Sequence, residues 1–174
     1  MWLLEVIKIA IPSTVTYLLG RWQGKKTRET LIESKSPRLK LRAVESVKRD
    51  ENGRIKLCKI EFKVQNVGFG SAFNIDIFDC RRANKEYKTM QGQPSSLTLL
   101  PGAPEQNYPF VFCSSDLSNE DLKANLLFVN TKCTGVFNNE IEQKFESIHL
   151  WDGGAGTYSF DLRETCSHVG TAKS

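Results

Sequence analysis

The sequence predicts a mainly β protein: one antiparallel sandwich of seven to nine strands, preceded by one N-terminal apolar helix. Residues 1–22 contain the long apolar segment of the chain. From Leu39 onward apolar and polar residues alternate with the period of two that is typical of strands with one buried face. Short segments rich in Gly, Asn and Pro separate these stretches, as turns do. We therefore divide the chain into a transmembrane or membrane-associated helix at 1–22, a basic polar linker at 23–37, a β-domain at 38–163 and a flexible tail at 164–174.

The N-terminal segment is just long enough to cross a membrane. About 20 mostly apolar residues cross the hydrocarbon core, and Trp2 and Trp22 would then lie at the two interfaces, where indole is favoured. On a helical wheel a polar stripe interrupts the apolar surface, and its residues are Glu5, Pro12, Thr16 and Gln23, with Lys8 at the edge. We expect a single-pass span whose stripe faces partner helices. An interfacial amphipathic helix, and a helix buried on the β-domain or in an oligomer, are the alternatives.

Basic residues follow the apolar segment at once. Between Arg21 and Lys59 there are 13 Lys or Arg and 5 Asp or Glu, a charge of +8 in a chain whose net charge is +4. The positive-inside rule then predicts that the β-domain lies on the cytoplasmic side of the membrane. The residues predicted at the membrane interface, in contact with anionic lipid, are Trp2, Arg21, Trp22, Lys25, Lys26 and Arg28. Nucleic acid is not an expected partner, because aromatic residues do not interleave with the basic ones.

Each predicted strand is bounded by a turn signal. After the first strand, from Leu39, the dipeptide Asn52-Gly53 predicts a hairpin, because it supplies the positive φ angles of a tight turn. The inward set then changes from odd to even residues around Cys58-Lys59, which predicts a β-bulge or a sharp bend there. Ser118 with Asp121 resembles the capping box of a short helix. The other predicted elements are strands through 73–77, 97–99, 108–112, 126–129, 141–150 and 157–162, an edge strand at Tyr87, a polar turn at 81–85 and a glycine turn at 153–156.

Two turn motifs identify a family resemblance. The run from Phe62 to Ile75 contains Asn-x-Gly-x-Gly-x-Ala before an alternating strand, and a Leu-x-Pro-Gly turn follows at Leu99. Both resemble bacterial immunoglobulin-like sandwiches, in particular the cell-adhesion-related domain found in bacteria, over residues 39–129. The resemblance implies an immunoglobulin-like fold whose fold-defining turn residues are Asn66, Gly68, Gly70, Pro101 and Gly102. Together with the expected orientation it implies a single-pass protein of the bacterial inner membrane. Gly68 and Gly70 are expected to take positive φ angles, and Asn66 to bond its own backbone.

No pattern identifies a catalytic, metal or cofactor site. The five cysteines are widely spaced and lack the close ligand pairs of zinc sites, so free thiols in a reducing compartment are expected. A set of Ser147, His149 and Asp152 can be drawn, but no nucleophile elbow lies beside it. The glycine run 153–156 is not followed by the Lys-Ser/Thr of a phosphate loop. The prediction is a protein that is not an enzyme and has no cofactor.

These observations favour a membrane-anchored, non-enzymatic interaction or sensing module with a protein partner or as a homo-oligomer. One alternative is an oligomeric membrane effector, whose β-domain binds a small ligand such as a nucleotide and whose helices form a bundle or pore. Another is a soluble assembly component whose N-terminal helix is buried against partner chains. The sequence does not identify the partner or the ligand.

Overall fold

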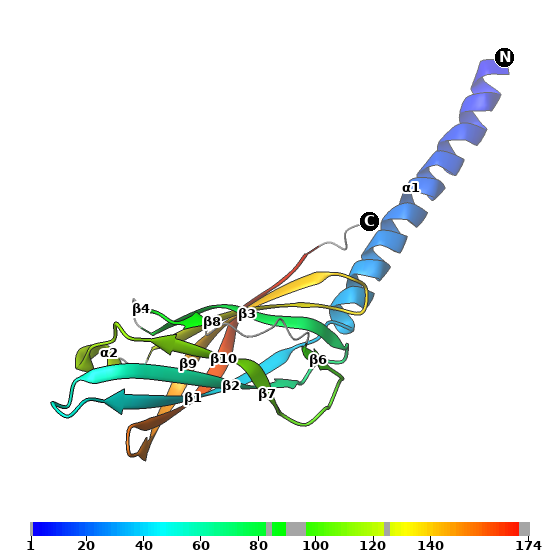
Figure 1. Cartoon of the computed structure of the whole chain (residues 1–174). Coiled ribbons are helices and arrows are strands. Elements are labelled where there is room, and N and C mark those ends of the chain that lie inside the picture. Colours follow the sequence, from blue (N-terminus) through cyan, green and yellow to red (C-terminus); the bar gives the residue numbers. More distant parts are fainter. Residues whose placement is uncertain (1, 83–84, 90–96, 124–125, 171–174) are drawn as a thin grey trace. The chain divides into compact units, whose positions relative to one another are not determined.

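The structure, a computed structural model, describes residues 2–82, 85–89, 97–123 and 126–170, with side chains from residue 17 onward. The chain divides into two compact units, residues 1–35 and 36–174. The first unit contains α1 (Trp2–Ser34). Figure 1 labels the elements of the second unit, which are β1 (Leu39–Arg49), β2 (Ile55–Asn66), β3 (Ala72–Arg82), β4 (Lys85–Glu86), β5 (Lys88–Thr89), β6 (Leu97–Leu99), β7 (Gln106–Ser114), α2 (Asn119–Lys123), β8 (Leu127–Thr134), β9 (Glu140–Gly154) and β10 (Thr157–Val169).

In the described residues ten strands form one antiparallel sheet, which confirms the prediction of a mainly β protein but exceeds the seven to nine strands predicted. Its order is β4-β3-β8-β9-β10-β1-β2-β7-β5, with β6 paired to β3. The sheet is curled, so that strands far apart in its strand order are in contact. The Tyr108 hydroxyl on β7 accepts a hydrogen bond of 3.0 Å from the Ile77 backbone N–H on β3, although five strands separate β3 from β7 along the sheet.

The core lies inside this curled sheet. It is built from strand residues that alternate inward, as the period-two pattern requires. The rings of Phe62 and Phe112 meet edge to face with their centroids 5.4 Å apart, an arrangement that aromatic pairs prefer. Other fully buried members are Leu41, Ile60, Val64, Leu99, Leu127, Val129, Ile141 and Phe160.

The first hairpin forms at the predicted turn, but its bulge lies elsewhere. Gly53 has a φ of +75°. Opposite the end of β1, the pairing skips Lys56, because Lys48 pairs with Leu57 and Arg49 with Ile55. The bulge predicted near Cys58 therefore lies at Lys56, and the even residues of β2 face inward from Cys58 onward.

The predicted capping box at the short helix is confirmed. The Asp121 backbone N–H donates to Ser118 Oγ at 3.1 Å, and the Ser118 backbone N–H donates to Asp121 Oδ2 at 2.8 Å. These reciprocal bonds satisfy donors that a helix start leaves unpaired. The hydrogen bonds that the Ser118 backbone N–H and hydroxyl donate to the Asp121 carboxylate lower the pKa of that carboxyl.

Three predicted boundaries need correction. Residues 23–34, assigned to the linker, continue α1. The tail predicted from residue 164 is β-structure as far as Val169, which pairs with Ile141 of β9; residues 171–174 lie outside the described residues. The polar turn predicted at 81–85 is also wrong at its start, because β3 continues through a fully buried Arg82. Residues 83–84 lie outside the described residues.

The predicted membrane placement also has to be corrected. In the part of the chain that the structure describes, no helix has the length and apolarity needed to cross a bilayer. From Arg21 to Ser34 the helix is rich in charged and polar residues, whose transfer into hydrocarbon is unfavourable. The transmembrane, single-pass helix and the inner-membrane localisation that depended on it are therefore not supported.

Candidate ligand-binding site

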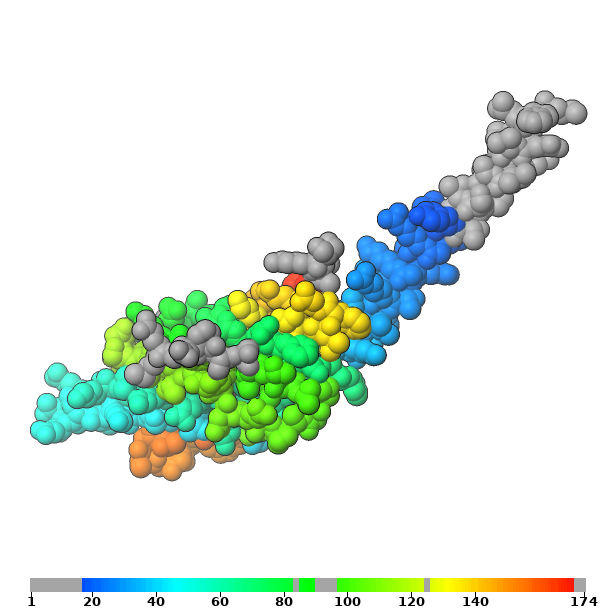
Figure 2. Space-filling model, turned by 45° about the vertical axis from the view of Figure 1, so that its right-hand side comes forward, coloured from blue at the N-terminus to red at the C-terminus, as the bar shows by residue number. Residues whose placement is uncertain are grey.

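A groove of about 390 Å³ lies on the outer face of the β-domain, where β9, β10, β1 and β2 are neighbours in the sheet. Figure 2 shows the orange turn of β9–β10 beside the cyan β1–β2 hairpin. We call this hollow the Trp151 groove. The residues that line it are Arg42, Ala43, Val44, Lys63, Glu105, Trp151, Ser159, Phe160 and Asp161.

The strand register brings the polar residues of the groove together. Arg42 on β1 lies opposite both Asp161 on β10 and Lys63 on β2. Two residues along β10, Ser159 lies opposite Trp151 on β9. Residues two apart on a strand share a face, so these two rows form one continuous surface.

The groove contains two cations and two carboxylates. Arg42 Nε is 3.2 Å from Asp161 Oδ1 and 3.9 Å from Glu105 Oε1. The Lys63 side chain is exposed on the neighbouring strand. The formal charges of these four groups cancel. Because Arg42 has two acidic neighbours, its guanidinium is held beside carboxylate oxygens, which places hydrogen-bond donors next to acceptors.

Trp151 supplies a flat apolar surface at the edge of this polar set. Half of its surface (50%) is exposed. The indole stacks on His149, with ring centroids 5.4 Å apart and planes inclined by 26°. His149 does not line the groove. Contact with His149 limits the movement of the indole, so a ligand with an apolar face can pack on a positioned ring.

The alternation pattern of the sequence did not predict this site, because a bulge in β9 changes which of its residues face outward. The inward residues of β9 are the odd ones from Ile141 to Ser147. Ser147 then pairs with Leu162 but His149 pairs with Asp161, so Ile148 is an extra residue. Beyond it the odd residues His149 and Trp151 are exposed. No signal in the sequence of this strand marks the bulge.

The structure does not assemble the Ser147–His149 pair. Ser147 is buried, and its Oγ accepts a hydrogen bond of 2.9 Å from the Leu127 backbone N–H. His149 is exposed on the other side of the bulge. Within the described ranges, no group of three His, Cys, Asp or Glu residues could hold a metal ion.

The buried cysteines are poor nucleophiles near neutral pH. All five cysteines are free thiols. Burial raises the pKa of Cys58 to about 11 and that of Cys133 to about 12. Both thiols therefore stay protonated near neutral pH, and a protonated thiol is a poor nucleophile.

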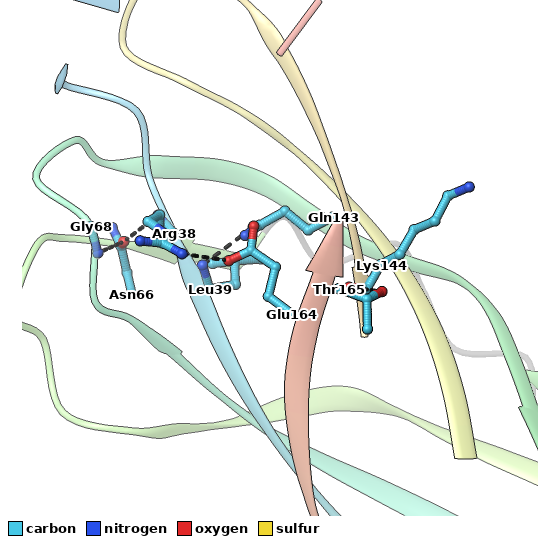
Figure 3. A network of polar contacts seen from close by, with 8 residues as sticks. All are labelled: Arg38, Leu39, Asn66, Gly68, Gln143, Lys144, Glu164 and Thr165. Atoms are coloured by element: carbon cyan, nitrogen blue, oxygen red, sulfur yellow. Dashed lines mark hydrogen bonds and ion pairs between the residues drawn. The ribbon is translucent and has the colours of Figure 1, made fainter. Parts of the chain in front are cut away.

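The predicted turn residues meet at one corner of the β-domain, built around Asn66. This side chain is fully buried. Its Nδ2 donates to the carbonyls of Gly70 and Leu99 at 2.7 and 3.1 Å. Its Oδ1 accepts from the backbone N–H groups of Gly68 and Arg38 at 3.0 and 3.3 Å, bonds that Figure 3 shows meeting at one amide.

A second group of bonds ties the same corner to the far strands. The Leu39 backbone N–H donates to Gln143 Oε1 at 3.2 Å, and Arg38 Nη2 donates to Glu164 Oε2 at 3.2 Å (Figure 3). These bonds connect the start of β1 with β9 and β10. The corner is therefore a structural anchor, in which the Asn66 amide and the Gln143 Oε1 atom are bonded by the protein itself, whereas the buried Gln143 Nε2 has no hydrogen-bond partner among the described residues.

Gly102 and Gly68 are each required at this corner, but for different reasons. Gly102, next to the exposed Pro101, has a φ of +68°, and its N–H donates to the Asn66 carbonyl at 3.3 Å. Neither Gly68 nor Gly70 adopts the expected positive φ. Instead, a Cβ at Gly68 would lie 2.3 Å from the Arg38 backbone nitrogen. The absence of a side chain there allows two backbone segments to approach closely.

The predicted membrane-stripe and interface residues all lie on α1. Glu5, Lys8, Pro12, Thr16 and Trp2 fall within its backbone, and their side chains lie outside the described residues. The remaining members, Arg21, Trp22, Lys25, Lys26 and Arg28, are exposed.

Three of these exposed residues have partners on the helix itself. Lys26 Nζ lies 5.3 Å from the Trp22 ring centroid. Lys25 forms an i,i+4 ion pair of 3.9 Å with Glu29. Exposed pairs of this kind contribute little to stability.

Comparison with known proteins gave no match. No family model, no curated protein and no solved structure is significantly similar to this chain.

Proposed function

We propose that this protein is a non-enzymatic binding module and that the Trp151 groove is its ligand site. The observation that carries the proposal is the half-exposed Trp151 beside the paired charges of Arg42 and Asp161 in one hollow. Ligand sites typically combine an apolar surface with a few placed polar groups, in volumes of about 300–1,000 Å³. The groove has each of these properties.

The chemistry of the groove supports binding rather than catalysis. Its carboxylates, Asp161 and Glu105, both lie near Arg42, so their oxygens already have a cationic partner within the protein. The hydroxyl of Ser159 is the candidate nucleophile of the lining. Neither His149 nor another histidine lines the groove to activate it.

The proposal is tested by ligand-observed NMR with the full chain. Mixtures of small polar compounds are screened against the wild type, against Trp151→Ala and against Trp22→Ala. Trp22 is a matched control because it is also an exposed tryptophan, but on α1. At least one compound should bind the wild type and Trp22→Ala and lose its signal with Trp151→Ala. Binding that does not depend on Trp151 would contradict the proposal.

The proposed fold relationship is an immunoglobulin-like sandwich. Its support is the corner at Asn66, where the chain leaves β2 and enters β3, strands that belong to opposite ends of the sheet order. The Tyr108–Ile77 bond joins those ends across the core. An experimental structure in which β3 and β7 do not face each other would contradict this relationship.

A second candidate role, assembly with a partner chain, is favoured by α1. Every residue from 17 to 31 is exposed, among them Leu18 (59%), Leu19 (53%) and Trp22 (59%). Covering apolar surface contributes about 25 cal/mol per Å². Residues 17–35 include five basic and two acidic residues. A parallel second copy would therefore be repelled, and the charge favours an acidic amphipathic helix as partner.

The assembly role is tested with a designed helical peptide that has Leu at positions a and d and Glu at e and g. It should bind the full chain, and added salt should weaken binding. Leu18→Glu should abolish the interaction, whereas Thr27→Glu, the same charge change on an exposed polar residue of α1, should reduce it only modestly. Equal binding of a Lys-substituted peptide would rule out the acidic partner.

A further inference from the structure

We infer that the Trp151 groove takes an uncharged sugar ring, an inference that rests on the ligand-binding role proposed above. Three properties of the groove lead to this class: its charge balance, its adjacent donors and acceptors, and its aromatic wall. Each property excludes a different competing class of small molecule.

The charge balance favours a neutral ligand. Arg42 and Lys63 contribute two positive charges, and Glu105 and Asp161 contribute two negative ones. A phosphorylated or polycarboxylate ligand that reaches Arg42 would also approach the Asp161 oxygen 3.2 Å from Arg42 Nε, and would be repelled by it. Like charges at such short range are unfavourable even in a partly hydrated site.

The polar groups favour a ligand rich in hydroxyls. A hydroxyl both donates and accepts hydrogen bonds. Within the groove, the guanidinium of Arg42 and the ammonium of Lys63 can only donate, whereas the carboxylates of Asp161 and Glu105 can only accept. The close contacts of Arg42 with both carboxylates place the two kinds of group side by side. Neighbouring hydroxyls on a sugar ring can use such a pair together.

The aromatic wall favours a ligand with an apolar face. Trp151 lines the groove with half of its surface exposed. One face of a pyranose ring presents C–H groups, and these can pack on an indole while the hydroxyls at the ring edge remain available for hydrogen bonds. A linear polyol or a small peptide amide lacks this division between apolar face and polar edge. Stacking on His149 positions the indole before the ligand arrives, which lowers the ordering cost of binding.

A nucleotide is the strongest competitor. Its base could also stack on Trp151, and its phosphates could approach Lys63. The two carboxylates beside Arg42 oppose this mode, because they leave the groove without net positive charge. The test below therefore includes a nucleotide.

The experiment is a calorimetric titration of the full chain. The probes are neutral oligosaccharides of glucose, mannose, xylose and N-acetylglucosamine, with ADP as the anionic competitor. At least one neutral oligosaccharide should bind, and its Kd should change little with salt because no net charge is exchanged. Trp151→Ala should weaken binding at least about tenfold, as expected for a central aromatic contact. Trp151→Phe should retain part of the affinity, and Trp22→Ala all of it.

The outcomes separate this inference from the proposed function. Trp151-dependent binding of ADP without any oligosaccharide would overturn the sugar inference and leave the ligand-binding role standing. Oligosaccharide binding that survives Trp151→Ala would overturn the inference and the assignment of the groove. If no probe binds the wild type, the sugar inference fails, and the broader NMR screen decides on the binding role. Circular dichroism and the urea midpoint of each variant show that a loss of binding is not a loss of folding.

Discussion

Asn66 forms four hydrogen bonds with the backbone of its own corner; three of them are buried, and the bond from the Arg38 N–H is partly buried. Its amide connects Arg38, Gly68, Gly70 and Leu99. A buried donor or acceptor that loses its partner costs about 1–3 kcal/mol. Asn66 therefore stabilises the corner more than its small size suggests.

We expect Asn66→Ala to lower the free energy of unfolding by about 2–4 kcal/mol, because it leaves several buried backbone groups unpaired. Urea unfolding followed by circular dichroism measures the change. Asn107→Ala, at an exposed position of β7, is the matched control and should change stability by less than about 0.5 kcal/mol. Equal effects of the two substitutions would show that the Asn66 bonds contribute nothing.

Glycine is required at position 68 because another backbone segment lies very close to it, not because its backbone angles are unusual. A Cβ there would meet the backbone at Arg38 N and Ser36 O, at 2.3 and 2.7 Å. Gly68→Ala should therefore destabilise the domain by about 1–3 kcal/mol, the usual cost of overpacking. At Gly153 a Cβ would find ordinary contacts, the nearest at 3.4 Å, so Gly153→Ala should be tolerated in the same urea experiment. Equal tolerance of Gly68→Ala would contradict the close approach.

At the scale of elements, a buried ion pair joins β1 to β3 across the core. Glu45 and Arg82 are both fully buried and form a salt bridge. Tyr87 donates its hydroxyl hydrogen bond to the same Glu45 carboxylate, and Arg82 donates to the Leu122 carbonyl at the end of α2. The Arg82 guanidinium also lies 5.1 Å from the Phe160 ring centroid. Four elements therefore depend on one charged cluster.

Breaking this cluster on one side should be costly. Arg82→Met leaves the Glu45 carboxylate buried without its cation, and we expect a loss of about 3–5 kcal/mol in the free energy of unfolding. The double variant Glu45→Leu/Arg82→Met should lose clearly less than the sum of the two single variants, because it removes both charges. Additive losses in urea unfolding would contradict the coupling. Arg81→Met is the control, since Arg81 pairs with Asp79 at the surface and exposed pairs contribute about 0–1 kcal/mol.

At the scale of the whole molecule, buried thiols and phenols make the free energy of unfolding fall as the pH becomes alkaline. Burial raises the pKa of Cys58 to about 11, of Cys133 to about 12 and of Tyr108 to about 12, and it also raises those of Cys80 and Tyr87. In the unfolded chain the thiols ionise near 9.0. The unfolded state therefore releases protons first as the pH rises, and unfolding becomes easier.

The expected result is a free energy of unfolding that is insensitive to these groups below about pH 9 and falls as the pH rises from about 9 toward 11. Urea titrations at several pH values measure the slope. Cys58→Val should reduce the slope, because it removes one thiol that ionises only in the unfolded state. Cys166→Ala is the control: Cys166 is exposed, and the slope should stay the same. An unchanged slope in Cys58→Val would exclude Cys58 as a contributor.

Local patterns in the sequence were sufficient for much of the β-domain. Alternation located the start of β1 at Leu39, the Asn52-Gly53 signal located the first hairpin, and Ser118 with Asp121 located α2. Each of these features depends on interactions between residues close in the chain. The membrane span, by contrast, was predicted from the apolar residues of the N-terminal segment alone. No helix in the described residues has the length and apolarity needed to cross a membrane.

What the sequence by itself determined is therefore the mainly β architecture, the first hairpin turn at Asn52-Gly53 and the capping box of α2. The tertiary structure alone decided which distant residues meet. The bulge at Ile148 turns Trp151 outward, and the pairing of β10 with β1 places Asp161 opposite Arg42. Likewise, Arg82 is buried because Glu45, 37 residues away, supplies its counter-charge. Register and charge pairing across strands depend on non-local contacts, and the period-two pattern of a single strand does not encode them.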